Sequence, residues 1–162
     1  MPQPVTVTVR QVIAAPPELV FAVVTDPTLN AQLSDDVLSI DIHERSPEGF
    51  AVRFSERRRL GRGEATFVYE RVDTDLQGLS TRVLNTFDAT DWDTRFVVQP
   101  HPEGAELSLH MEATGHRWGK RVQHVLLQWL YAWGMRKQLR SWAAYCAESA
   151  SSQSRSNDAH PS

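Results

Sequence analysis

Apolar and polar residues alternate at the start of the chain. Val5, Val7 and Val9 recur with a period of two, which places their side chains on one face of a β-strand. Pro16 and Pro17 stop this strand, because proline cannot donate a hydrogen bond to a β-ladder, and Pro17 suits the first turn of a helix. We therefore expect a first strand followed by a short helical pair.

Six further segments alternate in the same way, and four of the five breaks between them contain glycine or proline. Such breaks mark turns, and short connections between strands produce hairpins. The pattern therefore predicts an antiparallel sheet. The predicted strands cover residues 37–44, 50–57, 63–73, 79–87, 90–99 and 105–113.

A long helix is predicted from Arg117 to Glu148, where proline is absent and apolar residues recur at steps of three and four. We expect the apolar stripe to change direction near Gly134, a residue type that favours a bend in a helix. Its first half centres on Trp118, Val122, Trp129 and Trp133, and its second half on Met135, Leu139, Trp142 and Cys146. We expect residues 1–148 to form one domain and the Ser-rich residues 149–162 to be a disordered tail.

Composition places the chain among soluble globular proteins, with 41% hydrophobic and 23% charged residues in 162. The N-terminus lacks the basic and apolar stretches of a secretory signal, and the helix is too often interrupted by charge to span a bilayer. We expect a cytoplasmic protein without integral membrane association. The net charge is -3, but the helical segment 117–148 carries six basic residues against one acid.

The segment Ile13-Ala14-Ala15-Pro16-Pro17-Glu18-Leu19-Val20-Phe21, followed by Thr25-Asp26-Pro27, resembles the opening of the START-like, helix-grip superfamily. That superfamily (SRPBCC) includes polyketide cyclase/dehydrase-like proteins and the birch-pollen allergen group. The resemblance covers about residues 5–148. It implies an α+β helix-grip fold, in which a curved antiparallel sheet wraps around a long C-terminal helix. It also implies a cavity that holds lipids, sterols, polyketides or other apolar molecules.

Candidate ligand-binding residues follow when the alternation is extended along the strands. Tyr69, Asn85 and Thr94 are polar exceptions on the inward face, and a buried polar group needs a partner, which is a ligand, a neighbouring side chain or water. Two tryptophans of the helix are expected to add flat apolar walls. The full set is Phe54, Phe67, Tyr69, Asn85, Trp92, Thr94, Trp129 and Trp133.

These residues favour binding of a small hydrophobic ligand of lipid, polyketide or aromatic type. One alternative is a polyketide cyclase or dehydratase that uses the same cavity, although the sequence indicates no inward acid–base pair. A second alternative is an interaction module that acts through the C-terminal helix, as a homodimer or at an anionic membrane. It would draw on Leu127, Leu130, Tyr131, Arg136, Lys137 and Arg140.

Several other chemistries are excluded by missing motifs. The six histidines show no metal-site spacing, and Cys146 is the only cysteine, so we expect neither a metal nor a disulfide. Phosphate loops and dinucleotide fingerprints are absent, so no cofactor is expected. The basic cluster Arg57-Arg58-Arg59 with Arg62 lacks neighbouring aromatic residues, which argues against nucleic-acid binding.

Overall fold

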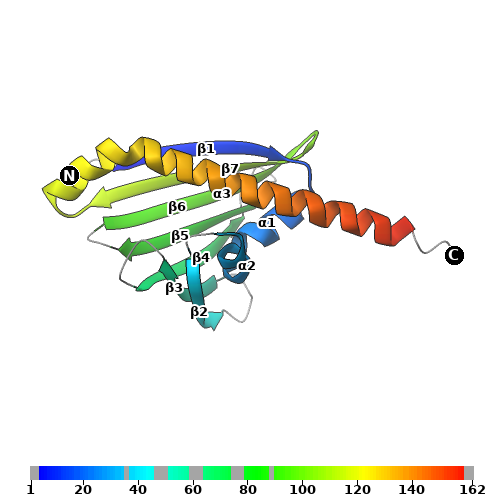
Figure 1. Cartoon of the computed structure of the whole chain (residues 1–162), viewed down its shortest axis with the longest axis horizontal. Coiled ribbons are helices and arrows are strands. Elements are labelled where there is room, and N and C mark those ends of the chain that lie inside the picture. Colours follow the sequence, from blue (N-terminus) through cyan, green and yellow to red (C-terminus); the bar gives the residue numbers. More distant parts are fainter. Residues whose placement is uncertain are drawn as a thin grey trace.

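The computed structural model describes the backbone of residues 4–34, 37–45, 51–58, 64–73, 79–87 and 90–158 (Figure 1). Side chains are described for residues 4–34, 37–44, 82–84 and 90–152. The elements in chain order are β1 (Val5–Ile13), α1 (Pro17–Thr25), α2 (Pro27–Leu33), β2 (Val37–Arg45), β3 (Ala51–Arg58), β4 (Glu64–Asp73), β5 (Leu79–Phe87), β6 (Thr90–His101), β7 (Gly104–Gly115) and α3 (Trp118–Asp158).

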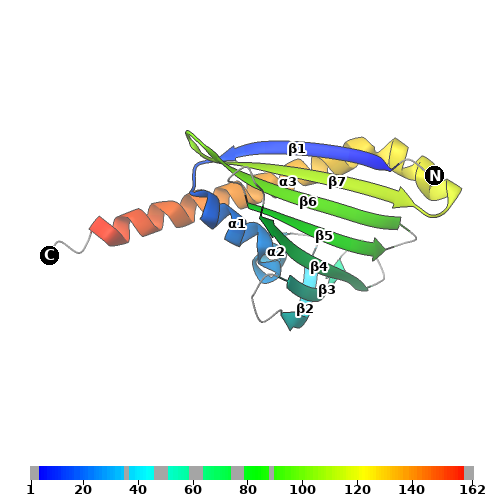
Figure 2. The same ribbon diagram turned by 180° about the vertical axis from the view of Figure 1, so that it is seen from behind.

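The described strands form one antiparallel sheet in the order β1-β7-β6-β5-β4-β3-β2. Consecutive strands from β2 to β7 pair as hairpin neighbours, and the last strand pairs with the first, which brings β1 beside β7. The helix-grip fold that the sequence predicted is confirmed, because this sheet carries the long C-terminal helix α3 across one face (Figures 1 and 2).

The helical pair after β1 follows from local chemistry. Pro17 occupies the first turn of α1, where its missing N–H costs no helical hydrogen bond. Asp26 caps α2, because its carboxylate accepts hydrogen bonds from the backbone N–H groups of Thr28 at 2.9 Å and Leu29 at 3.2 Å. The two helices therefore begin at proline-marked positions that the sequence identifies.

α3 is longer than predicted, because it ends at Asp158 rather than near Glu148. The hydroxyl of Ser151 donates to the carbonyl of Ala147 at 2.8 Å, and that of Ser152 donates to Glu148 at 2.9 Å. Hydrogen bonds of this i to i-4 kind satisfy the serine side chain within the helix. The expected disorder of residues 149–162 is thus wrong for residues 149–158.

The core lies between the sheet and α3, chiefly over β1 and β7, and α1 closes it at one end. Cys146 is fully buried in this core, as expected for a structural thiol, and burial raises its pKa to about 11. The largest fully buried side chains include Ile13, Val20, Val24, Val98, Leu107 and Leu139. These residues come from β1, α1, β6, β7 and α3, so every layer contributes to one core.

Candidate functional site

The inward face of α3 is a single straight stripe. Met135, Leu139 and Trp142 are buried, as the second half of the predicted stripe required. The same face continues toward the N-terminus through Tyr131 and His124, at steps of four and seven residues that keep side chains on one side of a helix. α3 runs through Gly134 without interruption (Figure 1). The predicted change of face at that glycine is therefore wrong.

Trp129 and Trp133 lie on the outward side of α3, where 67% and 55% of their surfaces are exposed. Such exposure is not that of side chains that line an interior cavity, so their expected role as cavity walls is wrong. Trp129 lies about 140° around the helix from the buried Trp142, given 3.6 residues per turn. Tyr131, expected on the outer surface, instead packs against the core.

A buried polar cluster joins α3 to the start of β6. His124 is only 3% exposed, and its Nε2 lies 2.8 Å from the hydroxyl of Thr90, which is 1% exposed. The other ring nitrogen, Nδ1, lies 2.8 Å from the hydroxyl of Tyr131. Both nitrogens therefore have hydroxyl partners, which offsets the cost of burying the imidazole.

Trp92 encloses this cluster from the sheet side. Its ring packs edge to face on the rings of His124 and Tyr131, with distances between ring centroids of 5.3 Å and 5.5 Å. Edge-to-face contacts of this kind stabilise aromatic groups beyond the burial of their area. Three aromatic side chains and one threonine thus form a compact site between β6 and α3, which we call the histidine cluster.

The histidine cluster combines two chemical properties. A neutral imidazole has one donor and one acceptor nitrogen, and each hydroxyl both donates and accepts. The hydrogen-bonded series Thr90–His124–Tyr131 can therefore hold its protons in more than one arrangement. The same set of hydrogen bonds also satisfies a core histidine structurally. Its two titratable members, His124 and Tyr131, lie on the sheet-facing side of α3, where the sequence indicated no pair of acid–base groups.

Backbone register places the predicted strand residues on one face of the sheet. Position 85 pairs with Trp92, and Val83 pairs with both Thr94 and position 69. Position 54 pairs with position 67, two residues before position 69 on β4. The side chains of Phe54, Phe67, Tyr69 and Asn85 lie outside the described side chains. Trp92 and Thr94 are described, and both are half-buried.

The opposite face of the sheet carries charged and polar groups in its described part. The Arg82 guanidinium donates from Nε to one carboxylate oxygen of Asp93 at 2.9 Å and from its terminal nitrogen to the other at 2.5 Å. These hydrogen bonds, helped by the guanidinium charge, lower the pKa of Asp93 despite its partial burial. His110 lies on this face too. Its Nδ1 is 2.8 Å from the hydroxyl of Thr8, and its Nε2 is 3.2 Å from a carboxylate oxygen of Glu112. It therefore points away from the face that carries Trp92.

Sequence reasoning missed the histidine cluster for an identifiable reason. The spacing of the histidines indicates only that they form no metal site, and the apolar periodicity assigns the tryptophans to the inward face of the helix. The spacing of seven residues between His124 and Tyr131, in line with Met135 and Trp142, was a usable signal, because it corresponds to two helical turns. The contact with Thr90 and Trp92 carries no local signal in the sequence.

Within the described part of the chain, no three His, Cys, Asp or Glu side chains come together in an arrangement able to hold a metal ion. The described helices also include none with both the length and the apolar character needed to cross a bilayer.

The sheet order, the helical pair and the long terminal helix define the helix-grip class of proteins. Residues 4–147 match the family described as polyketide cyclase / dehydrase and lipid transport. The chain belongs to this family. None of the curated proteins compared with it matches.

Solved structures share the fold at low sequence identity. The START superfamily protein from Mycobacterium smegmatis is 14% identical, with a TM-score of 0.67 over 90% of this chain and 98% of that one. The di-domain ARO/CYC StfQ from the steffimycin biosynthetic pathway is 14% identical, with a TM-score of 0.72 over 92% of this chain and 53% of that one. Human STARD10 is 13% identical, with a TM-score of 0.63 over 86% and 64%. At these identities the similarity establishes the fold alone.

Proposed function

We propose that this chain binds a small hydrophobic molecule of lipid, polyketide or aromatic type against the sheet face that carries Trp92. The observation that supports this most is the partial exposure of Trp92 and Thr94, next to the buried His124. α3 packs chiefly over β1 and β7, so the same face toward β5 is less covered by helix (Figure 1). A partly exposed aromatic ring beside a few fixed polar groups is typical of apolar ligand sites.

The histidine cluster supplies the polar component of this proposed site. Tyr131 and Thr94 are both half-buried and flank Trp92 from α3 and β6. A ligand with one polar atom and an apolar body would stack on Trp92 and direct its polar atom to the Tyr131 hydroxyl. Membership of the family described above supports an apolar ligand without specifying which one.

Binding of the apolar fluorescent probe 1-anilinonaphthalene-8-sulfonate tests this proposal. We expect saturable binding by the native chain, weakened about tenfold or more by Trp92→Ala, because one aromatic wall of a site is removed. Trp133→Ala is the matched control, since Trp133 lies on the outward side of α3, and it should leave probe affinity unchanged. Near-ultraviolet circular dichroism of both variants shows whether the fold is retained.

Two results would reject the ligand site. One is a native chain that shows no saturable binding of the probe. The other is an equal loss of affinity in Trp92→Ala and Trp133→Ala, which would place the probe on a surface rather than on the face that carries Trp92.

A second candidate function is catalysis of the cyclase or dehydratase type, and the pairing of His124 with Tyr131 at 2.8 Å favours it. A histidine–tyrosine pair can pass a proton to or from a reacting carbonyl compound. With a poly-β-keto thioester as substrate, Tyr131→Phe should then reduce turnover by a larger factor than it reduces affinity for the probe. A native chain that binds the probe but leaves the thioester unchanged would exclude this function and retain simple binding.

A further inference from the structure

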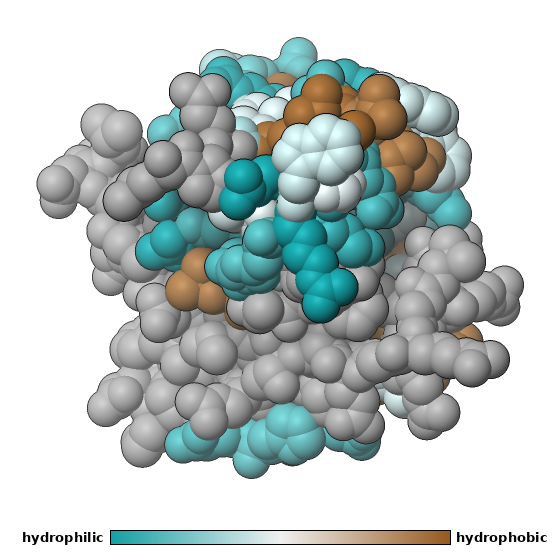
Figure 3. Space-filling view, turned by 90° about the vertical axis from the view of Figure 1, so that its left-hand side faces the viewer, coloured by the Kyte–Doolittle hydropathy of each residue, from teal (hydrophilic) through white to brown (hydrophobic). Residues whose placement is uncertain are grey.

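The outward side of α3 exposes an unusual number of large apolar side chains. Trp118 is 78% exposed, Trp129 67% and Leu126 66%. Figure 3, which views the end of the molecule where α3 begins, shows brown hydrophobic atoms at the surface beside near-white and teal ones. We define the outer helix face as Trp118, Val122, Val125, Leu126, Trp129 and Trp133.

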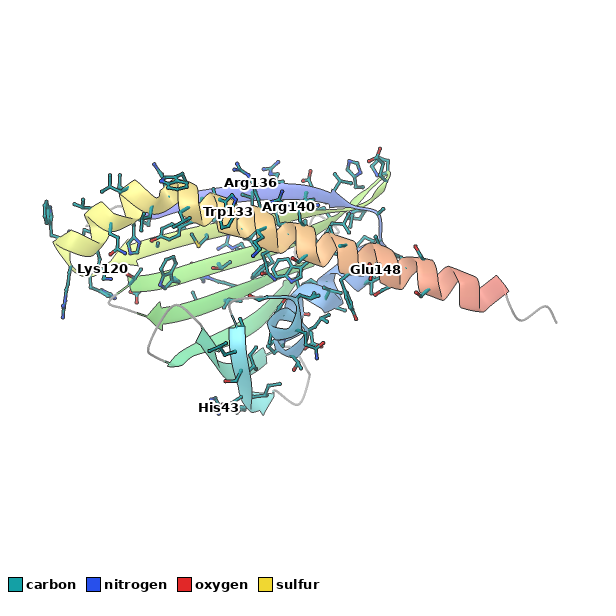
Figure 4. The ribbon with its side chains drawn as sticks, in the orientation of Figure 1. His43, Lys120, Trp133, Arg136, Arg140 and Glu148 are labelled. Atoms are coloured by element: carbon teal, nitrogen blue, oxygen red, sulfur yellow. The ribbon has the colours of Figure 1, made fainter. Side chains whose placement is uncertain are left out.

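These apolar residues are continuous with positive charge. Arg136 and Arg140 follow Trp129 and Trp133 at steps of three and four residues, so they prolong the same side of the helix, and both are exposed. Figure 4 shows them with Trp133 along α3, and Lys120 near its start. Between Arg117 and Ala147 the chain has six basic residues and no acid. The outer helix face therefore lies within a stretch of helix, about 33 Å long from Trp118 to Arg140, in which every Asp, Glu, Lys or Arg position is basic.

We propose that the outer helix face docks onto an anionic lipid surface. Tryptophan favours the boundary between hydrocarbon and headgroups, because its ring is apolar and its indole N–H is polar. A helix with tryptophan and aliphatic residues on one side, flanked by arginine and lysine, lies in the plane of that boundary. The basic side chains then contact anionic headgroups while the apolar side chains enter the acyl region.

Charge distribution decides between a lipid surface and a second copy of the chain. Segment 117–148 carries a net charge of +5, and the rest of the chain carries -8, which together give the total of -3. A two-fold contact through the outer helix face would bring the positively charged α3 segments of two copies against each other. An anionic membrane instead attracts this side of the molecule and repels the remainder, so it also sets the orientation.

Co-sedimentation with vesicles tests this docking directly. The native chain should bind vesicles of phosphatidylcholine with about 30% phosphatidylserine and bind pure phosphatidylcholine at least about tenfold more weakly. Added salt should weaken the binding to anionic vesicles, because it screens exposed charges. Tryptophan emission should shift to shorter wavelength on binding, since the exposed indoles leave water.

Four variants identify the surface. Trp129→Ala combined with Trp133→Ala should weaken binding about tenfold or more, and Arg136→Glu combined with Arg140→Glu should remove the preference for anionic vesicles, since each basic side chain contributes roughly fivefold. The matched controls are Leu84→Ala, an exposed apolar residue of β5, and Arg10→Glu, an exposed basic residue of β1. Both controls should bind as the native chain does. Because all six residues are exposed, the urea midpoints of the variants should stay close to native.

Three outcomes would overturn the proposal. The first is a native chain that shows no preference for anionic vesicles. The second is that the outer-face variants bind vesicles as well as the controls do. The third is a native chain that does not bind vesicles but forms a concentration-dependent dimer in sedimentation velocity, and loses that dimer in the Trp129→Ala/Trp133→Ala variant. That result would assign the outer helix face to contact with a second copy of the chain. Probe binding against Trp92 is independent of all three, so the proposed ligand site and this surface can fail separately.

Discussion

Trp142 and Trp129 show how differently the same residue type is used on α3. Trp142 is 4% exposed, its Nε1 donates to the Oδ1 of Asn30 at 2.6 Å, and its ring meets Phe96 edge to face at 5.7 Å. It therefore ties α3 to both α2 and β6. Trp129 lies on the outer helix face and is mainly exposed.

Alanine at these two positions should have very different effects on stability. Trp142→Ala should lower the free energy of unfolding by about 3–5 kcal/mol, because it opens a cavity and leaves the Asn30 amide without this donor. Trp129→Ala should change it by no more than about 0.5 kcal/mol, as expected of a surface position. Urea denaturation followed by circular dichroism measures both. Equal shifts of the two midpoints would show that the helix face assigned here is wrong.

Gly104 is the residue where glycine is required in the β6–β7 hairpin. Its φ is +134°, and a Cβ there would lie 2.3 Å from the carbonyl oxygen of Ile13. Gly104→Ala should therefore destabilise the fold by about 1–3 kcal/mol or more, through backbone strain and a clash with fixed backbone. Thermal denaturation measures this loss.

Gly134→Ala is the matched control for Gly104→Ala. A Cβ at position 134 meets no atom within 4 Å, and the residue lies in the interior of α3. The substitution should raise stability by roughly 0.5–1 kcal/mol, because alanine favours the helix more than glycine does. A destabilised Gly134→Ala would indicate a close neighbour of α3 at this position.

At the scale of elements, the sheet has a chemically different role on each face. One face carries Trp92 and Thr94 toward α3, and the other carries charged pairs such as Arg82 with Asp93. These two residues lie on neighbouring strands, β5 and β6, and join them through two hydrogen bonds. The pair strengthens the hairpin on its solvent side without contributing to the proposed ligand site.

This pair predicts a small loss of stability in acid. The pKa of Asp93 is lower in the folded chain than its ordinary value of 3.8. The stabilisation is therefore present above the unfolded pKa and is lost as pH falls through the folded one. Because both side chains are partly exposed, the contribution should be no more than about 1 kcal/mol. Asp93→Asn should flatten the stability curve of the native chain below about pH 4; an unchanged slope would show that the pair contributes nothing.

At the scale of the whole molecule, α3 extends past the sheet toward the C-terminus (Figure 2). Its contacts with the core become fewer along this end: Cys146 is fully buried, Ala150 is partly buried against the core, and Ser151 and Ser152 are exposed. The stability of the chain should therefore depend on where the helix ends.

Truncation tests this dependence. A chain that ends at Ser152 should unfold within about 0.5 kcal/mol of the native chain, because it loses no buried side chain of the described part. A chain that ends at Tyr145 should lose about 2 kcal/mol or more, since the removal of Cys146 exposes or empties part of the core. Differential scanning calorimetry measures both. A large loss on truncation at Ser152 would mean that the last helical residues dock elsewhere on the molecule.

Local physics made most of the architecture predictable from the sequence. Alternation with a period of two marked the six strands from β2 to β7 to within two residues, because a strand with one face on a core and the other in water has apolar residues at every second position. Asp26 and the prolines marked the helical pair, because their geometry acts within one turn. The buried second half of α3 followed from its apolar stripe, which contains no competing set of large apolar residues.

Only the tertiary structure decided which side of the first half of α3 faces the sheet. Three tryptophans at helical spacing outweigh one histidine in any count of apolar residues, so the pattern favoured them as the inward face. The buried position of His124 is stabilised by Thr90 and Tyr131, and the first of these partners comes from a distant strand. The contact with Thr90 leaves no periodic signal, because it depends on the docking of α3 against β6 rather than on neighbours in the sequence.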